Sequence, residues 1–403
     1  MQFIHQPIEF GGVAVKNRIV IQPMEGCDCE EDGSPSELTQ KKYLRFALSG
    51  AGIIWFEANA VTKEGRTNAR QMMLTAENLH QFQALLAEIR EIATEKFGFA
   101  PLMILQLTHS GRQSMVPICA YHNSVYEAKR PIKDENIASD EYLASLPERY
   151  ARSALLAKQA GFDGVDVKCC HGYLMQETLS AFTRAGSYGG SLQNRMRLFL
   201  DCFRAVKRAV GEDLLIASRF DPSDVVPYPN GFGTDEKGEV DLTEGKLVLS
   251  ALYQEGLRLV NITLGNPYYN PHVNRPFRAG PYTPPEKAET GLKRFTDVEK
   301  ELKRCFPDMI FVGSGLSYYR EDLLERAEEL VEQGVCDLVG FGRESLAYPE
   351  FYADCLSGRF DAKKTCVTCS RCTTLMRCGL VSGCAVFNEY YKNLYREKVA
   401  CKK

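Results

Sequence analysis

Four cysteines near the end of the 403-residue chain have the spacing of a metal site. They follow the pattern C-x2-C-x2-C-x11-C and are Cys366, Cys369, Cys372 and Cys384. Cysteine thiolates are soft ligands that suit an iron–sulfur cluster or Zn²⁺. Zinc sites more often combine two separated C-x2-C pairs, whereas this tight run suits ligands that close around a [4Fe–4S] cube. We therefore predict a [4Fe–4S] cluster, with zinc or a run of ordinary buried thiols as alternatives.

A fifth cysteine, Cys378, lies between the third and fourth predicted ligands. It can in principle replace Cys372 or Cys384, but the spacing favours leaving it out. Because such a cluster usually carries electrons, the rest of the chain should provide a group that exchanges electrons with it.

The composition excludes several classes of function. Hydrophobic residues make up 44% of the chain, charged residues 25%, and the net charge is −3, so no basic field attracts nucleic acid or an anionic membrane. The sequence shows no signal-peptide pattern at its start and no apolar run of the roughly 18 residues that a membrane span needs. Fifteen cysteines without an export signal are typical of a reducing compartment. We expect a cytoplasmic protein.

The predicted secondary structure that must position these residues repeats a strand-like segment eight times. Short apolar segments end in polar or glycine residues and are followed by stretches with helical spacing, such as residues 78–95 and 320–333. The predicted strands cover residues 18–23, 52–57, 101–107, 164–168, 214–219, 259–263, 309–313 and 337–342. Strands of this kind that alternate with helices form a covered parallel sheet. The pattern predicts an α/β fold, a (β/α)8 TIM barrel over residues 1–360, with a small C-terminal iron–sulfur segment over residues 361–403.

A doubly wound sheet is the alternative, but it leaves open edges, and the chain lacks the G-x-G-x-x-G dinucleotide fingerprint. In a TIM barrel the active residues lie at the C-terminal ends of the strands. Glycine-rich turns follow the seventh and eighth predicted strands, at Gly313-Ser314-Gly315 and Gly342-Arg343. These turns predict a phosphate cradle, although small residues also simply permit tight turns.

The residues at the strand ends resemble the old yellow enzyme family of FMN-dependent NADH:flavin oxidoreductases. The matching pieces include Gln22-Pro23-Met24, Q-L-T-H-S-G-R at residues 106–112, H-G-Y-L at 171–174 and Y-G-G-S at 188–191. The cysteine segment resembles the branch with 2,4-dienoyl-CoA reductase and trimethylamine dehydrogenase, in which it holds a [4Fe–4S] cluster. That branch usually continues into FAD- and NAD(P)-binding domains. We expect this chain to be the barrel-plus-cluster portion alone.

The resemblance implies an FMN site at the barrel mouth. Main chain at Pro23, Met24 and Ala58 would line one edge of the flavin ring, with Glu25 beside it. Gln106 would bond the pyrimidine edge, and Arg219 would lie near N1, where negative charge accumulates in the reduced flavin. Burial of Arg219 without an anionic partner would be costly, which supports this assignment. The two glycine turns and Arg343 would bind the phosphate.

The substrate side departs from the family pattern. Tyr173 matches the family's proton donor, and His171 matches the second of two residues that bond the substrate's oxygen, but Lys168 replaces the first. A lysine there can hold a carboxylate or carbonyl oxygen, or it can pair with Glu25 or Glu57. Those glutamates can alternatively recognise a cationic substrate. His272, in the aromatic-rich loop at residues 266–272, is a second donor candidate.

We predict an FMN- and [4Fe–4S]-dependent ene-reductase that reduces the C=C bond of an α,β-unsaturated carbonyl or carboxylate. Hydride would come from flavin N5 and the proton from Tyr173. We expect NAD(P)H as the electron donor, either directly or through a partner flavoprotein or ferredoxin that feeds the cluster. A homo-oligomer is also possible. The alternatives are an amine dehydrogenase similar to trimethylamine dehydrogenase and an electron-transfer subunit.

Overall fold

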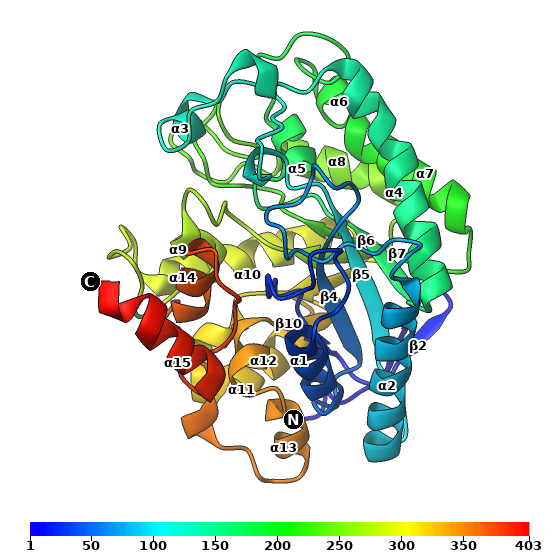
Figure 1. The fold of residues 1–403 in the computed structure, drawn as a ribbon, viewed down its shortest axis with the longest axis vertical. Helices are drawn as coiled ribbons and strands as arrows, with labels where there is room; N and C mark the ends of the chain where they lie inside the picture. Colours follow the sequence, from blue (N-terminus) through cyan, green and yellow to red (C-terminus); the bar gives the residue numbers. More distant parts are fainter. Residues whose placement is uncertain (403) are drawn as a thin grey trace.

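The computed structural model describes residues 1–402 and contains a closed barrel of eight parallel strands (Figure 1). The order around the barrel is β10, β3, β4, β5, β6, β7, β8 and β9. These strands are β3 (Ile19–Ile21), β4 (Ile53–Ala60), β5 (Leu102–Thr108), β6 (Gly164–Val167), β7 (Leu215–Phe220), β8 (Leu259–Ile262), β9 (Ile310–Gly313) and β10 (Leu338–Phe341). Each predicted strand overlaps one of them, and the expected (β/α)8 barrel is confirmed.

Long helices cover the outside of the barrel, as the alternation of strand and helix patterns predicts. They are α1 (Glu37–Ala47), α2 (Leu79–Phe97), α4 (Asp140–Ala160), α7 (Arg197–Val210), α8 (Thr243–Gln254), α10 (Ala288–Cys305) and α11 (Leu323–Glu332). Helix α11 begins later than expected because Arg320, in the preceding 3-10 turn, has a non-helical φ of 54°. The apolar faces of these helices pack on the strands in one large buried core.

Shorter helices lie in the loops and near the end of the chain. They are α3 (Ser124–Glu127), α5 (Leu174–Leu179), α6 (Leu192–Arg195), α9 (Pro271–Asn274), α12 (Arg343–Ala347), α13 (Phe351–Leu356), α14 (Arg371–Arg377) and α15 (Glu389–Lys398). Several follow strands at the barrel mouth, where they carry the side chains described below.

An antiparallel hairpin closes the opposite end of the barrel. It consists of β1 (Ile8–Phe10) and β2 (Val13–Val15), and its buried Phe10 and Val15 pack against residues near the strand starts, such as Ile53. This hairpin could not be predicted from the sequence, because two three-residue strands are too short to show a period. The hairpin leaves the C-terminal ends of the strands as the open end.

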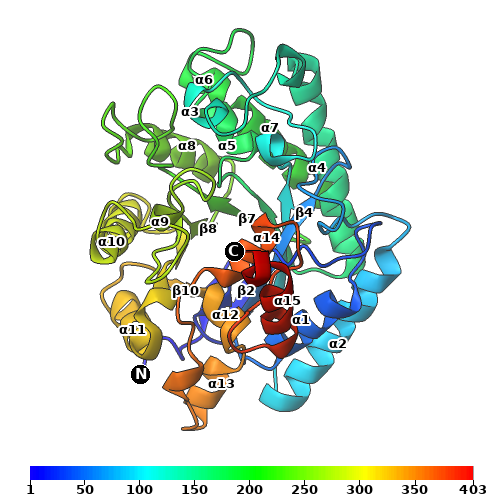
Figure 2. The same cartoon turned by 60° about the vertical axis from the view of Figure 1, so that its left-hand side comes forward.

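The cysteine-rich segment crosses that open end (Figure 2). Ser382 N donates a hydrogen bond to Gly26 O at 2.6 Å, and Cys366 N donates to the buried carboxyl of Glu344 at 2.8 Å. A small apolar cluster of Leu375, Val381, Ala385, Tyr391 and Val399 forms beneath α14 and α15, with Leu38 of α1 against it. The segment is therefore fixed to the barrel. The division of the chain at residues 360 and 361 stays a prediction.

Within residues 1–402, no helix combines the length and the apolar composition that crossing a membrane would require.

Candidate functional site

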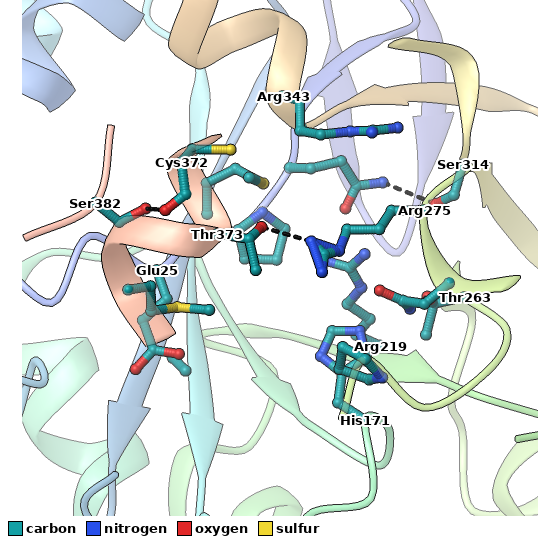
Figure 3. A pocket seen from close by; sticks show the side chains of 18 of the residues that line it. Glu25, His171, Arg219, Thr263, Arg275, Ser314, Arg343, Cys372, Thr373 and Ser382 are labelled. Carbon is teal, nitrogen blue, oxygen red and sulfur yellow. Dashed lines mark hydrogen bonds between the residues drawn. The ribbon is translucent and has the colours of Figure 1, made fainter. Parts of the chain in front are cut away.

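A cavity lies between the ends of the strands and helix α14 (Figure 3). Of the residues that the sequence analysis connected with the cofactor or the substrate, all line it except Glu57, His272 and Gly313, the last residue of β9. Those that line it are Pro23, Met24, Glu25, Ala58, Gln106, Lys168, His171, Tyr173, Arg219, Ser314, Gly315, Gly342 and Arg343. The barrel thus brings together residues that are more than 300 positions apart in the chain.

Five cationic side chains line this cavity without a carboxylate partner. Within residues 1–402, Lys168, Arg219, Arg275, Arg343 and the more exposed Arg377 make no ion pair within 4.0 Å, and Glu25 supplies the one carboxylate among the residues that line the cavity. Arg343 Nη1 and Arg219 Nε are buried without a hydrogen-bond partner. Buried cations in this state require an anionic ligand to offset their desolvation. The cavity is therefore suited to an anionic ligand.

Arg275 is a cation that the sequence analysis did not predict. It follows α9, and its guanidinium donates to Thr373 Oγ1 of α14, next to Cys372. Burial and repulsion by Arg343 lower the pKa of Arg275 to about 10, so it remains charged at neutral pH. No motif marks this arginine, because the loop after β8 brings it to the cavity only once the barrel has formed.

Asp166, on β6, accepts hydrogen bonds that hold neighbouring groups of the site in place. Its carboxylate accepts hydrogen bonds from Gln106 Nε2 at 2.7 Å, Trp55 Nε1 at 2.9 Å and Arg219 N at 2.6 Å. Because Nε2 of Gln106 is bound to Asp166, its Oε1 is the atom left for a ligand. That acceptor suits the N–H at the pyrimidine edge of a flavin.

The predicted phosphate cradle needs one correction. Ser314 N donates to Glu299 Oε1 at 2.9 Å, and Ser314 Oγ donates to Ile262 O at 2.7 Å, so both donors of Ser314 are used within the protein. Gly315 has a positive φ of 87°, and a Cβ at Gly342 would lie 2.8 Å from Met24 Sδ. Gly315, Gly342 and Arg343 therefore remain as the candidates for binding a phosphate.

Lys168 does not pair with either glutamate, which overturns that interpretation of the sequence. Glu57 Oε1 instead binds Lys42 Nζ at 2.6 Å, and Glu25 Oε1 accepts from Thr67 Oγ1 at 3.0 Å. The Lys168 side chain is 4% exposed, with Nζ 4.2 Å from the ring centroid of Tyr173. Burial lowers its pKa below the usual 10.5. This ammonium lacks a protein counter-ion in the described part of the chain.

His171 and Tyr173 lie on the turn after β6. His171 has φ of 68°, followed by Gly172 at 66°, and its Nε2 is buried without a hydrogen-bond partner. Burial, together with the charges of Lys168 and Arg219, holds the pKa of His171 well below 6.5, so its imidazole is neutral at neutral pH. A neutral imidazole can donate one hydrogen bond to a ligand oxygen.

Tyr173 forms a pair with a second tyrosine that the sequence analysis did not single out. The hydroxyl groups of Tyr173 and Tyr268 lie 3.2 Å apart. Burial raises the pKa of Tyr173 well above 10, which keeps its proton available. The aromatic-rich loop was noted for His272, but His272 does not line the cavity and its Nδ1 contacts Tyr282 Oη at 2.7 Å.

The four predicted cluster ligands line one small second cavity, with mostly apolar neighbours such as Leu346 and Phe387. Cys372 and Arg343 line both cavities, so the two sites adjoin. Cys378 is exposed and lies outside this lining. Within residues 1–402, no three His, Cys, Asp or Glu side chains are close enough to hold a single metal ion.

His109 lies in the Q-L-T-H-S-G-R motif. We expect its protonation to destabilise the folded protein at acid pH. Its Nδ1 accepts from Gly111 N at 3.1 Å, and burial lowers its pKa to about 4. At this residue the unfolded chain therefore binds one more proton between about pH 6.5 and 4, and the contribution of His109 to the free energy of unfolding should fall by about 3 kcal/mol across that interval.

Urea unfolding measured at intervals between pH 7 and pH 4 tests this prediction. His109→Gln removes the titrating group and should flatten the pH dependence. An equally steep dependence in wild type and variant would assign the acid sensitivity to other groups.

Comparisons with known proteins agree with this geometry. The model of a family described as "NADH:flavin oxidoreductase / NADH oxidase family" matches residues 3–250. The chain is 28% identical over 369 residues to an NADH oxidase of Thermoanaerobacter brockii and 25% identical over 384 residues to a cinnamate reductase of Clostridium sporogenes. These matches cover 89% and 91% of this chain but 52% and 54% of the relatives. The chain thus spans about half the length of these curated relatives.

A solved structure of 2-naphthoyl-CoA reductase in complex with 2-naphthoyl-CoA has the same fold. It superposes with a TM-score of 0.77 at 21% identity, over 98% of this chain and 58% of the other.

Proposed function

The chain belongs to the NADH:flavin oxidoreductase / NADH oxidase family, and on that premise we propose that it uses FMN and a [4Fe–4S] cluster to reduce the C=C bond of an α,β-unsaturated carboxylate or carbonyl compound. The observation that carries this proposal is the grouping of Lys168, His171 and Tyr173 at one cationic cavity. Together they supply a counter-ion, a neutral hydrogen-bond donor and an acid.

The residues present suit an FMN. Arg343, Gly315 and Gly342 would hold the phosphate, Gln106 Oε1 the pyrimidine N–H, and Arg219 the edge at N1. Bound FMN would supply the hydride that reaches the β-carbon of the alkene. The fixed positive charge of Arg219 would stabilise negative charge at that edge of a reduced flavin.

The substrate would be held by its oxygen atoms. Lys168 and His171 would bind the carboxylate or carbonyl, withdraw electron density from the double bond and make its β-carbon more electrophilic. Tyr173 would deliver its phenolic proton to the α-carbon. Tyr268 is placed to hydrogen-bond the resulting phenolate and help return a proton to it, because the two hydroxyl groups are 3.2 Å apart.

Among the two substrate classes, we favour the carboxylate. Lys168 is a buried cation with no counter-ion among residues 1–402, and a carboxylate forms a stronger charge-assisted hydrogen bond with it than a neutral carbonyl does. The similarity to a cinnamate reductase supports this choice, since cinnamate is an α,β-unsaturated carboxylate.

The cluster would connect the flavin to an electron source. The four cysteines surround one cavity that shares Cys372 and Arg343 with the flavin cavity. NAD(P)H would supply electrons either directly above the flavin or through a partner flavoprotein or ferredoxin that reduces the cluster. We assign the cluster to residues 361–403 and the chemistry to residues 1–360.

Amine oxidation is the second candidate, favoured by the carboxylate of Glu25 in the cavity. The surrounding charge argues against it, because Glu57 binds Lys42 instead and five cations without an ion pair within residues 1–402 line the same cavity. A pure electron-relay subunit is a third candidate, but a relay has no need for a buried tyrosine acid.

Spectra of the anaerobically purified protein distinguish these candidates. We expect one FMN and four iron atoms per chain, and an enoate or enone should reoxidise the reduced flavin. An amine that bleaches the oxidised flavin would favour amine oxidation, and a flavin spectrum insensitive to both classes would favour the relay. Protein without FMN would contradict all three.

Replacement of Lys168 by methionine should weaken selection of carboxylates. The variant keeps the length of the side chain but loses a charge-assisted bond worth about 1.5–3 kcal/mol, so kcat/KM for an enoate should fall about 10- to 100-fold. The loss for the corresponding neutral enone should be smaller. Lys158→Met, at an exposed ion pair on α4, is the control and should leave both substrates unaffected. Equal losses for enoate and enone would contradict the assigned role.

A further inference from the structure

A buried group of charges lies behind the loop that follows β3. Lys42 Nζ of α1 contacts Glu57 Oε1 at 2.6 Å and both carboxylate oxygens of Asp28 at 3.1 Å. The exposed fractions of these side chains are 6%, 1% and 0%. Thr39 Oγ1 and Tyr43 Oη donate further hydrogen bonds to the two carboxylates. None of these side chains lines the flavin cavity, so the proposed chemistry does not account for them.

A β-bulge places Glu57 in this group. The pairing of β4 with β5 shifts between Phe56 and Ala58, which leaves Glu57 as the extra residue. Ala58 can then line the cavity while Glu57 binds α1 outside it. From the sequence, Glu57 was expected to pair with Lys168 or to recognise a cationic substrate, because a regular strand gives no sign of this bulge.

A continuous hydrogen-bond path leads from Glu57 to a predicted cluster ligand. Gly26 N donates to Glu57 Oε2 at 2.7 Å, and Gly26 O accepts from Ser382 N at 2.6 Å. Ser382 Oγ then donates to Cys372 O at 3.0 Å (Figure 3). Each step is short, and Gly26 follows directly after Met24 and Glu25 of the cavity lining.

Packing at both ends leaves this path little freedom. A Cβ at Gly26 would lie 2.3 Å from Lys42 Nζ, and one at Gly383 would lie 2.2 Å from the ring of Tyr391. Tyr391 is itself buried in the small core of the cysteine segment. The charged group, the loop after β3 and the cysteine segment are therefore packed as one unit.

We propose that Glu57 is a positioning residue that, through Gly26 and Ser382, fixes Cys372 and the metal centre it would bind relative to the flavin cavity. This inference rests on the proposed function for the presence of the cluster. Its physical basis is that a displaced ligand changes the hydrogen bonds and solvent exposure of a cluster, and both set its reduction potential.

Glu57→Gln tests the path with little damage to the fold. A glutamine side chain has one acceptor oxygen, whereas Lys42 Nζ and Gly26 N each require one, so one of these two bonds must be lost. The variant leaves Lys42 paired with Asp28, so no buried charge is stranded. Glu177→Gln is the matched control, because Glu177 is equally buried and binds Arg112 away from the cysteine segment.

Two measurements on the anaerobically purified full chain decide the matter. At a fixed solution potential, Glu57→Gln should change the ratio of reduced to oxidised cluster at least tenfold, which is 59 mV for one electron. Amide hydrogen exchange at residues 378–386 should become at least tenfold faster. The Glu177→Gln control should resemble wild type in both. Ser382→Ala, which removes the bond to Cys372 O without touching the charged group, should shift the potential too.

A wild-type potential and wild-type exchange in both Glu57→Gln and Ser382→Ala would overturn the inference. If the wild-type protein contains no iron, the proposal that this protein holds an iron–sulfur cluster is wrong. The exchange measurement still decides whether Glu57 positions the cysteine segment. If Glu57→Gln does not fold, Ser382→Ala tests the last step of the path, and a wild-type potential with wild-type exchange in that variant would overturn the inference.

Discussion

Replacing Tyr173 by phenylalanine is expected to slow the reoxidation of reduced flavin by an enoate by about 10²- to 10⁴-fold, the range that a positioned acid contributes. The variant removes one oxygen and keeps the ring that packs beside Lys168. FMN content and the rate of flavin reduction should therefore remain those of wild type. Rapid mixing of reduced enzyme with enoate, followed at the flavin absorption band, measures this effect.

Tyr268→Phe serves as the graded comparison. It removes the hydroxyl that lies 3.2 Å from that of Tyr173 but leaves the acid itself, so the expected loss is smaller. Full activity of Tyr173→Phe would mean that another group donates the proton. A larger loss of activity in Tyr268→Phe than in Tyr173→Phe would mean that Tyr268 is the proton donor and Tyr173 its hydrogen-bonding neighbour.

Replacing Cys369 by alanine is expected to reduce the iron content to less than a tenth of the wild-type value. A [4Fe–4S] cluster needs all four ligands, and Cys369 lines the cysteine cavity without lining the flavin cavity. FMN should therefore remain bound. Electron transfer from a reduced partner protein should be lost, while chemically reduced flavin should still react with the substrate.

Cys378→Ser is the control for this prediction, because Cys378 is exposed and does not line the cysteine cavity. Its iron content should equal that of wild type. Iron retained in Cys369→Ala, or lost in Cys378→Ser, would show that the ligand set is different. Zinc in place of iron in the wild-type protein would contradict the cluster itself.

Much of the architecture could be predicted from the sequence because the eight strands are mostly buried and have largely apolar sequences. The family assignment followed from motifs whose residues must be specific types, and the family match confirms it. The hairpin formed by β1 and β2 could not be predicted, since three residues carry no period. The residues predicted for the site gather at one cavity because strand ends of a barrel converge.

The remaining residues of the site depend on tertiary contacts that no local pattern encodes. Arg275 and Tyr268 come from an irregular loop, and their importance lies in the neighbours that the fold gives them. Glu57 was expected to pair with Lys168 or a cationic substrate, but a one-residue bulge in β4 places it against Lys42. Ser314 lies at the expected turn, yet Glu299, from the preceding helix α10, accepts a hydrogen bond from its N–H.

The most direct test of the proposed function is to reduce the anaerobically purified enzyme and mix it with one equivalent of cinnamate in the absence of any other electron donor. We expect the flavin band to return and one equivalent of the saturated acid, 3-phenylpropionate, to form. Lys168, His171 and Tyr173 would then act on an unsaturated carboxylate as proposed. A flavin that stays reduced with cinnamate and with a panel of other enoates and enones would contradict the account.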